Sequence, residues 1–363
     1  MTKPRIIISS YDDIKNPFYA GGGAIAVHEV AKRLALKFQV TVICGKYPDS
    51  QEQIVDGVSY QHVGINTHNP QLSQIAFSLS LPGQVRTRNF DLWIESFTPP
   101  FSTNFLPLFT KKPVIGLIHM LSGEDMWRKY KLPFFLIERL GLNLYPQLIS
   151  TSDYFSQLIS SYNSKAKITV IPNGVDLPEI KLKGKYVSYI GRIEVNQKGL
   201  DLLLQAYKKF SLKNPIKLQI AGNGTPREEA KLKHLIQKLK LEDKVILRGR
   251  LSGPDKHNFL SESLVMAVPS RFETFSISAL ESIATGVPCV SFDIPGLSWM
   301  PENLGFKVPK FDIDIYAQAL QVASHKNLQR HYQTVCKKFA VDFTWDKSSQ
   351  KYMQLITKTL NLK

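Results

Sequence analysis

Short apolar runs alternate with longer segments of helical periodicity along the whole chain. The first run, Arg5 to Ser10, is rich in β-branched residues, and apolar positions then recur at helical spacing from Ala26 to Leu34. The first pattern predicts a strand and the second an amphipathic helix. Repetition of this alternation predicts parallel sheets that are covered by helices.

The same two patterns continue to the end of the chain. In the first half they predict strands at Gln39 to Cys44, Val58 to Val63, Asp91 to Glu95, Val114 to Ile118, Leu148 to Ser152 and Ile168 to Ile171, and a helix at Leu72 to Leu81. In the second half they predict strands at Tyr186 to Ile190, Ile216 to Ile220, Val245 to Leu247 and Leu264 to Val268, and helices at Pro226 to Leu239 and Lys347 to Leu360. Two doubly wound halves, joined by a linker at Lys181 to Lys185, imply a cleft between their strand ends.

The stretch after the strand at Leu264 to Val268 has the clearest pattern for a ligand site. A polar loop with Glu273 follows the strand, a helical segment begins near Ser276 and stops at Gly286, and a further strand follows around Cys289. Glu281 lies about one and a half turns inside this helix. Taken alone, the two glutamates are better explained as solvated carboxylates on a surface βαβ unit.

The start of the same helix favours a negatively charged ligand. The backbone amides around Phe275 to Ile277 have no partner within the helix, and the helix dipole is positive there. These amides would favour an anion such as a phosphate. Other motifs in the chain are needed to distinguish a ligand site from a solvent-exposed surface.

Other predicted strands also end in glycines or polar residues. Gly22 and Gly23 precede the first helix, where backbone amides can approach a ligand closely, although glycines also serve plain turns. Arg192 and Lys198 share a loop after a strand, where two cations can hold a diphosphate. His119 directly follows a buried strand, where ligands bind in open α/β sheets, but a lone histidine is more often packed or solvated.

The composition agrees with a globular protein of two domains. The chain has 363 residues, of which 43% are hydrophobic and 21% charged, and its formal net charge is +16. Such a charge favours nucleic acid, an anionic membrane surface or a phosphate-bearing substrate as a partner, and nucleic acid ranks last because no arginine-rich arm is present. Three well separated cysteines predict neither a disulfide framework nor a metal site, and favour a reducing cytoplasm.

The lengths of the apolar runs indicate whether the chain could cross a membrane. None is long enough for a signal peptide or a membrane span, so we expect a cytoplasmic protein. The segment Met126 to Tyr145 mixes apolar residues with Arg128, Lys129, Lys131 and Arg139. A segment of this kind can rest on an anionic membrane, here at its inner face, or cover an acceptor groove, but packing between helices explains the same residues and is preferred.

The motifs, taken in order, resemble those of the retaining glycosyltransferases of family 4, which have the GT-B fold. The resemblance covers nearly the whole chain. It rests on Gly21-Gly22-Gly23, His119, Gly191-Arg192 with Lys198-Gly199, Gly222-x-Gly224, Glu273-x7-Glu281 and the final Phe343-Thr344-Trp345.

The resemblance implies an α/β fold of two doubly wound Rossmann-like domains that face a central cleft. Residues 1–178 would form an acceptor-binding domain, and residues 179–342 a domain that binds the nucleotide-sugar donor. Residues 343–363 would form a C-terminal helix that crosses back to the first domain.

The resemblance also implies roles for residues of the second half. Arg192 and Lys198 would bind the diphosphate of the donor and compensate charge as its glycosidic bond breaks. Glu273 would contact hydroxyls of the transferred sugar, and Glu281 would accept hydrogen bonds from the ribose diol. The other implied donor-binding positions are Gly222, Arg250, Leu251, Thr274, Phe275, Ser276 and Ile277.

In the first half, the resemblance assigns roles to three residues. Gly22 and Gly23 would approach the diphosphate from the other domain, and His119 matches a histidine near the reacting centre of the sugar. The implied reaction retains configuration through a front-face, oxocarbenium-like path, and needs neither a divalent metal nor a cofactor besides the UDP- or GDP-linked donor. The carboxylates at Asp12-Asp13 and Asp312-x-Asp314 lie outside the matched loops, so we interpret them as surface residues.

Two departures from the family pattern concern the sugar pocket. Met120 stands where the family often has Asp, and Thr274 and Ser276 stand where it often has glycines. The expected function is sugar transfer to a hydroxyl of a glycan, a polysaccharide precursor or a lipid-linked acceptor. Two alternatives stay open: another GT-B enzyme, such as a sugar-nucleotide epimerase or a phosphorylase, and a non-catalytic sugar-nucleotide sensor.

Overall fold

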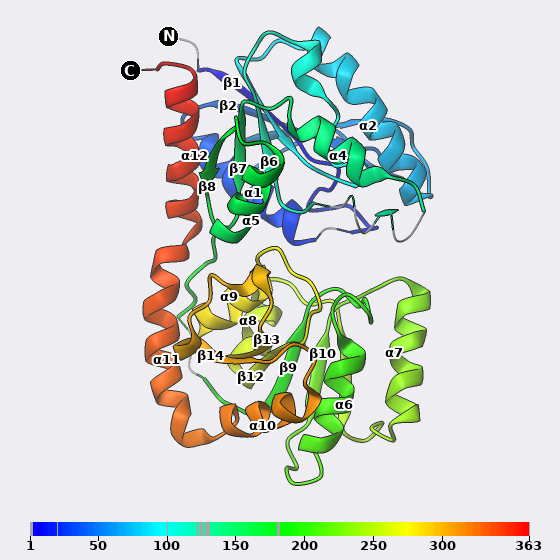
Figure 1. Ribbon diagram of the computed structural model, residues 1–363, viewed down its shortest axis with the longest axis vertical. Coiled ribbons are helices and arrows are strands. Elements are labelled where there is room, and N and C mark those ends of the chain that lie inside the picture. Colours follow the sequence, from blue (N-terminus) through cyan, green and yellow to red (C-terminus); the bar gives the residue numbers. More distant parts are fainter. Residues whose placement is uncertain are drawn as a thin grey trace. The chain divides into compact units, whose positions relative to one another are not determined.

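The computed structural model describes residues 3–19, 21–99, 101–121, 123, 126–127, 131–179 and 182–362. The chain divides into two units (Figure 1). Met1–Gly174 and Trp345–Lys363 form the first unit, and Val175–Thr344 form the second. Within the described residues, each unit is built on one sheet of mainly parallel strands.

The sheet of the first unit has the strand order β3-β4-β2-β1-β5-β6-β7-β8. Its neighbouring strands are parallel except for the pair β3 and β4. The strands are β1 (Arg5–Ser9), β2 (Gln39–Gly45), β3 (Gln53–Val55), β4 (Val58–Val63), β5 (Leu92–Ser96), β6 (Val114–Ile118), β7 (Gln147–Ser150) and β8 (Lys167–Val170). Helices of this unit for which the structure gives both ends are α1 (Gly22–Leu34), α2 (Pro70–Thr87), η1 (Leu106–Phe109), α4 (Phe134–Leu142), α5 (Asp153–Tyr162) and α12 (Trp345–Thr359).

Helices cover both faces of this first sheet. Ile6 and Ile8 of β1 belong to a buried cluster with residues of α1 and α12, whereas Ile7 belongs to a second cluster with residues of α2 and α5. Successive side chains of a strand point to opposite faces, so the two clusters lie on opposite sides of the sheet. The last helix, α12, packs against α1 of this unit (Figure 1).

The sheet of the second unit has the order β11-β10-β9-β12-β13-β14, and its paired strands are parallel. The strands are β9 (Tyr186–Ile190), β10 (Leu218–Ala221), β11 (Val245–Gly249), β12 (Ser263–Val268), β13 (Cys289–Phe292) and β14 (Gly305–Val308). The helices are α6 (Leu200–Phe210), α7 (Pro226–Lys238), α8 (Gly253–Ser261), α9 (Ile277–Thr285), η2 (Pro295–Leu297), η3 (Glu302–Leu304), α10 (Ile313–Ala323), α11 (Lys326–Ala340) and η4 (Val341–Phe343).

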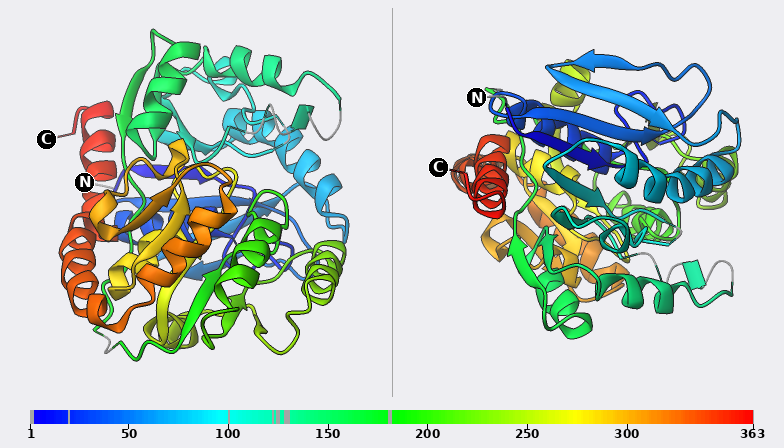
Figure 2. Two further views of the ribbon diagram at one scale, coloured as in Figure 1. Left: turned by 60° about the horizontal axis from the view of Figure 1, so that its bottom comes forward. Right: turned by 90° about the horizontal axis from the view of Figure 1, so that it is seen from above.

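The helices of the second unit pack in two groups. α6 packs against α10 (Figure 2), while α9 contacts both α8 and α11. Strand β12 lies next to β9 at the centre of the sheet, so the chain reverses its direction of winding there. In doubly wound sheets, ligands bind outside the carboxyl ends of the strands at such a point.

The doubly wound pattern expected from the sequence is confirmed in both units, but two edge strands were missed. β3 has only three residues, and β14, with the sequence GFKV, contains a glycine and a lysine. Runs this short and polar carry too little periodicity to predict a strand. The predicted helix at Leu72 to Leu81 extends to Thr87 and contains Pro82.

The interpretation of Asp13 as a surface carboxylate was wrong. Asp13 is only 2% exposed, and its Oδ2 lies 2.7 Å from Nε2 of His62 in β4 and 3.2 Å from the hydroxyl oxygen of Tyr47. Asp12 accepts a hydrogen bond of 2.8 Å from the amide of Gly21. These contacts anchor the loop after β1, and they join residues too far apart in sequence for a local pattern to reveal.

The preference for core packing in the basic segment is also corrected in part. Leu136 and Leu140 of α4 are 49% and 68% exposed, whereas Gly141 and Leu142 are buried. Packing between helices therefore does not account for the two exposed leucines. Residues 128–130 of this segment lie outside the described residues. In the part of the chain that is described, no helix has both the length and the apolar character to cross a membrane.

Candidate functional site

Most of the predicted site residues lie at one edge of the second sheet. Their loops follow the carboxyl ends of β9, β10, β11 and β12, which are adjacent and parallel, so the loops emerge on the same side. Arg192 and Lys198 follow β9, Gly222 follows β10, Arg250 and Leu251 follow β11, Glu273, Thr274, Phe275 and Ser276 follow β12, and Ile277 and Glu281 lie in α9.

Lys198 and Glu273 form an ion pair between two of these loops. Nζ of Lys198 lies 2.6 Å from Oε1 of Glu273, and the two side chains are only 20% and 10% exposed. The hydroxyl of Ser270 donates to the same carboxylate oxygen at 2.7 Å. The structure thus brings a predicted cation and a predicted carboxylate into direct contact and holds both in place.

Arg192 has a different environment. Its side chain is 52% exposed, and Nη2 lies 2.8 Å from Oε2 of Glu194 and 3.1 Å from Oε1 of Gln197. The hydroxyl of Tyr189 donates to the carbonyl oxygen of Arg192 at 2.8 Å, which fixes the backbone of the loop. The loop therefore presents an accessible guanidinium group at the edge of the sheet.

Arg271, which the sequence pattern did not single out, ties the two loops together. Its guanidinium group donates to both carboxylate oxygens of Asp201 at 2.7 Å and to the carbonyl oxygen of Asn196 at 2.7 Å. Its backbone amide donates to the carbonyl oxygen of Gln197 at 2.9 Å. A bidentate pair of this kind fixes the relative orientation of its partners. Arg271 thus aligns the segment before Lys198 with the loop that carries Glu273.

Glu281 contacts a second lysine that the sequence pattern also missed. Nζ of Lys256 in α8 donates to Oε1 of Glu281 in α9 at 2.6 Å. Their side chains are 19% and 18% exposed. Each of the two predicted carboxylates, Glu273 and Glu281, is therefore paired with its own lysine. Lys256 lies in a charged segment without a motif, so only the contact identifies it.

The start of α9 lacks a cap from its own side chains. Ser276 at the N-cap has a left-handed backbone (φ 63°) and makes no capping hydrogen bond with its side chain, and the first turn contains no acidic residue. Trp299 stacks on Phe275, with ring centroids 4.7 Å apart, and donates to the Phe275 carbonyl oxygen at 2.5 Å. The amides of this first turn have no partner within the helix, and they suit an anion.

Two glycines allow close contacts behind these loops. A Cβ at Gly222 would lie 1.8 Å from the carbonyl oxygen of Gly191, and a Cβ at Gly296 would lie 1.8 Å from the carbonyl oxygen of Glu273. No other residue fits at such distances. The loop that leads into Arg192 therefore packs on the turn after β10, and the loop of Glu273 packs on the segment after β13.

The other predicted residues belong to the first unit. Gly22 and Gly23 form the first turn of α1, and a Cβ at Gly23 would meet no atom within 4 Å. His119 directly follows β6, and its buried Nε2 has no hydrogen-bond partner among the described residues. Burial lowers the pKa of His119 to about 4, so its imidazole is neutral near pH 7.

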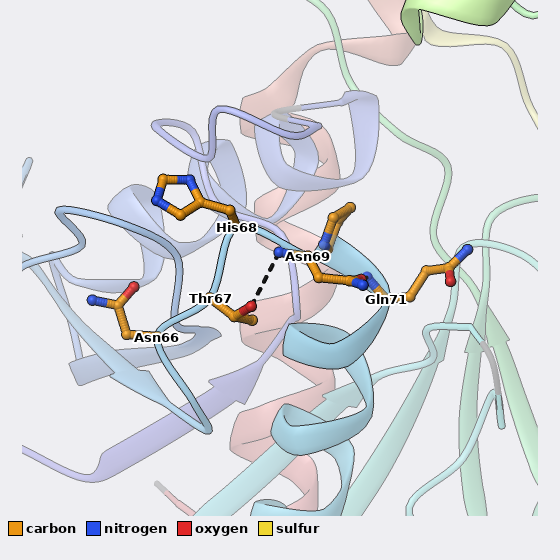
Figure 3. Close-up of a pocket in the computed structure, with 6 residues that line it drawn as sticks. Asn66, Thr67, His68, Asn69 and Gln71 are labelled. Carbon is orange, nitrogen blue, oxygen red and sulfur yellow. Dashed lines mark hydrogen bonds between the residues drawn. The ribbon is translucent and has the colours of Figure 1, made fainter.

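A surface depression in the first unit is lined by none of the predicted residues. The loop between β4 and α2 lines it with Asn66, Thr67, His68 and Asn69, and the first two residues of α2, Pro70 and Gln71, complete the lining (Figure 3). The amide of Asn69 donates to Oγ1 of Thr67 at 3.1 Å, as the dashed line in Figure 3 shows. The side chain of Asn69 also caps α2 by accepting from the amides of Gln71 and Leu72. These bonds give the loop a defined shape.

Cysteine and acidic side chains form no metal-binding cluster in the part of the chain that is described. Cys44, Cys289 and Cys336 are buried and free of disulfides. Burial raises the pKa of each of these thiols, which keeps them protonated and unreactive.

Comparison with known families gives one match for each unit. Residues 20–179 match the family model described as Glycosyltransferase Family 4. Residues 176–334 match the model described as Glycosyl transferases group 1. The two matches overlap at residues 176–179 and together span most of the chain.

Curated proteins with similar sequences carry names of sugar transferases. An N-acetylgalactosamine-N,N'-diacetylbacillosaminyl-diphospho-undecaprenol 4-alpha-N-acetylgalactosaminyltransferase from Campylobacter jejuni is 26% identical over 291 residues, which are 76% of this chain and 78% of that protein. A GDP-mannose:cellobiosyl-diphosphopolyprenol alpha-mannosyltransferase from Xanthomonas campestris is 29% identical over 199 residues. That match spans 52% of this chain and only 51% of the relative.

Solved structures of low sequence identity share the fold over nearly the whole chain. Sucrose-phosphate synthase from Thermosynechococcus elongatus has a TM-score of 0.86 at 18% identity, covering 99% of this chain and 100% of that one. HepE from Anabaena, solved with UDP and glucose, has a TM-score of 0.76 at 14% identity, covering 98% and 99%. The GT-B fold expected from the motifs is therefore confirmed.

Proposed function

The chain belongs to the family 4 glycosyltransferases, and we propose that it transfers a sugar with retention of anomeric configuration to a glycan, a polysaccharide precursor or a lipid-linked acceptor. Family and fold support the coarser statement directly, namely a glycosyltransferase that uses a nucleotide-sugar donor. The resemblance first seen in the motifs is confirmed. Retention, the acceptor and the residue roles are our proposals.

The proposal rests mainly on the grouping of charges at the carboxyl edge of the second sheet. Lys198, Arg192 and the first-turn amides of α9 supply positive charge and N–H donors there, as a diphosphate requires. Glu273 and Glu281 supply acceptors for hydroxyl groups of the sugar and the ribose. A diphosphate with a sugar at either end needs this combination of donors and acceptors.

The contact between Lys198 and Glu273 supports a shared role at the reacting centre. A lysine ammonium has three N–H donors, so Lys198 can keep its bond to Glu273 and donate to a phosphate oxygen as well. The negative charge on the departing diphosphate grows as the glycosidic bond breaks. Lys198 would stabilise this charge, while Glu273 would hold hydroxyls of the sugar and stabilise a cationic, oxocarbenium-like ring.

We assign the remaining donor contacts by position. Glu281 would bind the ribose, and Gly222, Arg250 and Leu251 would meet the nucleobase of a UDP- or GDP-linked donor. Because cations and amides already neutralise the diphosphate, we propose that transfer proceeds without a divalent metal or another cofactor. In the first unit, the assignments of His119, Gly22 and Gly23 stay predictions. A neutral His119 suits a hydrogen bond to a sugar hydroxyl.

A lipid-linked acceptor at the cytoplasmic face of a membrane is the acceptor that we favour. The names of the Campylobacter and Xanthomonas relatives contain diphospho-undecaprenol and diphosphopolyprenol, which are lipid carriers. In this chain, the exposed Leu136 and Leu140 lie beside Arg139 on α4, a combination that suits an anionic lipid surface. We therefore propose a cytoplasmic enzyme that contacts the membrane from the side.

Substitution of the proposed donor residues tests the function. Donors are first screened by thermal shift, because a nucleotide sugar at about 100 times its dissociation constant stabilises the protein by about 2.7 kcal/mol. Transfer from the best donor is then measured for Lys198→Ala and Glu281→Ala. We expect each variant to lose at least about 100-fold in kcat/KM, since each removes a charged contact to the donor.

The exposed Lys233 on α7 provides the matched control. Lys233→Ala should keep full activity, and all variants should keep the melting temperature of the unsubstituted protein within a few degrees. Near-normal turnover of Lys198→Ala or Glu281→Ala would refute the site assignment.

Donor binding without transfer to any acceptor would favour a sugar-nucleotide sensor instead. An anomeric configuration in the product opposite to that of the donor would refute retention.

A further inference from the structure

Lys256 lies on the core-facing side of α8 and not on its solvent side. Phe259 and Leu260, three and four residues further on, are buried, and residues at this spacing share one face of a helix. Only 19% of the Lys256 side chain is exposed. A lysine that serves solubility lies on the opposite face, so this position indicates a partner or a ligand.

The partner of Lys256 is Glu281, across the contact between α8 and α9. Nζ donates to Oε1 at 2.6 Å. Within the described residues, Oε2 of Glu281 has no hydrogen-bond partner. One oxygen of the carboxylate is thus held by the lysine, while the other keeps its full capacity to accept hydrogen bonds.

The ion pair of Lys256 and Glu281 also reduces the repulsion between the carboxylate and a bound nucleotide. A nucleoside diphosphate is an anion, and a carboxylate in its binding site repels it unless a cation lies nearby. Lys256 supplies that cation for Glu281, as Lys198 does for Glu273. A fixed side chain also lowers the entropy lost on binding, because its rotamer is set before the ligand arrives.

We propose that Lys256 is a positioning residue for the nucleotide. It holds Glu281 by Oε1, so that the carboxylate accepts hydrogen bonds from the 2′- and 3′-hydroxyls of the ribose. This inference rests on the proposed function, in which Glu281 binds the ribose of the donor. It adds that selection of a ribonucleotide over a 2′-deoxyribonucleotide depends on Lys256.

Nucleotide affinities of Lys256→Met test the proposal. Dissociation constants for UDP, GDP and their 2′-deoxy forms are measured by isothermal titration calorimetry. We expect Lys256→Met to bind the preferred ribonucleotide about tenfold more weakly, because a well-placed hydrogen bond to a charged group is lost. Binding of the 2′-deoxy form should change much less, so the preference for ribose falls towards one. Lys256→Arg, which keeps the charge, should recover part of the preference.

Two controls separate positioning from a general effect. Lys233→Met removes an exposed positive charge from α7 of the same unit, and should leave the ribose preference unchanged. In the double variant Lys256→Met/Glu281→Ala, the loss should be no larger than in Glu281→Ala alone, because the lysine acts through the glutamate. Melting temperatures verify that each variant is folded.

The outcomes distinguish this inference from the function on which it rests. If the unsubstituted protein binds neither UDP nor GDP, the proposed function fails and the inference fails with it. If it binds and Lys256→Met keeps the full ribose preference, the inference alone is overturned. Equal weakening of the ribose and deoxyribose forms also overturns it, since a general charge effect then explains the loss.

Discussion

At the scale of single residues, the buried carboxyl group of Glu95 makes the stability of the first unit depend on pH. Glu95 at the end of β5 is fully buried, and its Oε1 accepts from the amide and the side chain of Asn104 at 2.7 and 2.9 Å. The hydroxyl of Tyr145 donates to Oε2. Burial nevertheless dominates and raises the pKa of Glu95 to about 7. The carboxyl group of Glu95 is therefore protonated over much of the acid range.

Glu95→Gln should change how stability depends on pH. The raised pKa means that the folded protein binds a proton more tightly than the unfolded chain, so Glu95 costs stability as the pH rises from about 4.5 to 7. The neutral glutamine avoids this cost. We expect the variant to be more stable than the original at pH 8 by about 3 kcal/mol, and similar at pH 4. Urea denaturation at both pH values measures the difference.

The exposed Glu52 serves as the control for this experiment. Glu52→Gln removes one negative charge from the surface of the same unit, so a change that it shares with Glu95→Gln comes from net charge and not from burial. Identical pH profiles for Glu95→Gln and the original protein would show that the fold does not raise the pKa of Glu95.

At the scale of elements, the candidate site depends on how loops are tied to helices. Arg271 follows β12, and Asp201 lies in the first turn of α6. Their bidentate pair, with side chains 28% and 27% exposed, joins the loop of Glu273 to the helix that follows Lys198. A pair this accessible adds little to global stability. Its main effect is on the relative position of Lys198 and Glu273.

Arg271→Ala should therefore impair transfer more than it impairs folding. Under the proposed function Lys198 and Glu273 act at the reacting centre, where small displacements reduce rates steeply, so we expect a loss of about 10- to 100-fold in kcat/KM. The melting temperature should fall only slightly. Activity assays of Arg271→Ala, Asp201→Asn and the double variant measure the coupling, and the losses should not add because both changes break one contact.

An exposed ion pair in the same unit offers a comparison. Lys209 of α6 pairs with Asp314 at 2.5 Å, and the side chains are 51% and 70% exposed. Lys209→Ala should keep normal kcat/KM. If Arg271→Ala also keeps normal kcat/KM, the alignment of the two loops does not depend on this contact.

On the scale of the whole molecule, the charge of +16 and the exposed leucines of the first unit are the features on which the proposed membrane contact rests. A net charge of this size attracts the protein to an anionic surface over a distance that shrinks as salt is added. The exposed Leu136 and Leu140 add apolar contact on α4. Both effects together favour binding at the surface without a membrane-spanning helix.

Vesicle binding tests this expectation. The protein should bind vesicles of phosphatidylcholine with phosphatidylglycerol at low salt and leave them as salt rises, because the attraction is screened. Leu136→Glu with Leu140→Glu should weaken binding by at least about tenfold, since apolar contact is replaced by repulsion. Leu212→Glu, at a leucine 76% exposed in the second unit, is the matched control. Failure to bind at low salt would refute membrane contact.

The sequence by itself determined the order of most strands and helices and the edge of the second sheet at which most of the candidate site residues lie. Hydrophobic periodicity is a local property, so it predicted the central strands of both sheets within a residue or two. In a parallel sheet the carboxyl ends share one side, so Arg192, Lys198 and Glu273 could be placed at one edge before any contact was known. The short edge strands β3 and β14 were not predicted, because their hydrophobic periodicity is too weak.

Only the tertiary structure decided which side chains meet across that edge. The ion pairs Lys256–Glu281 and Arg271–Asp201 join residues of different loops and helices. The spacing of these residues along the chain does not predict that they meet. The burial of Asp13 and the exposure of Leu136 were likewise invisible to a local pattern. The physical reason is that periodicity records which face of an element is apolar, whereas a side-chain contact depends on how separate elements pack.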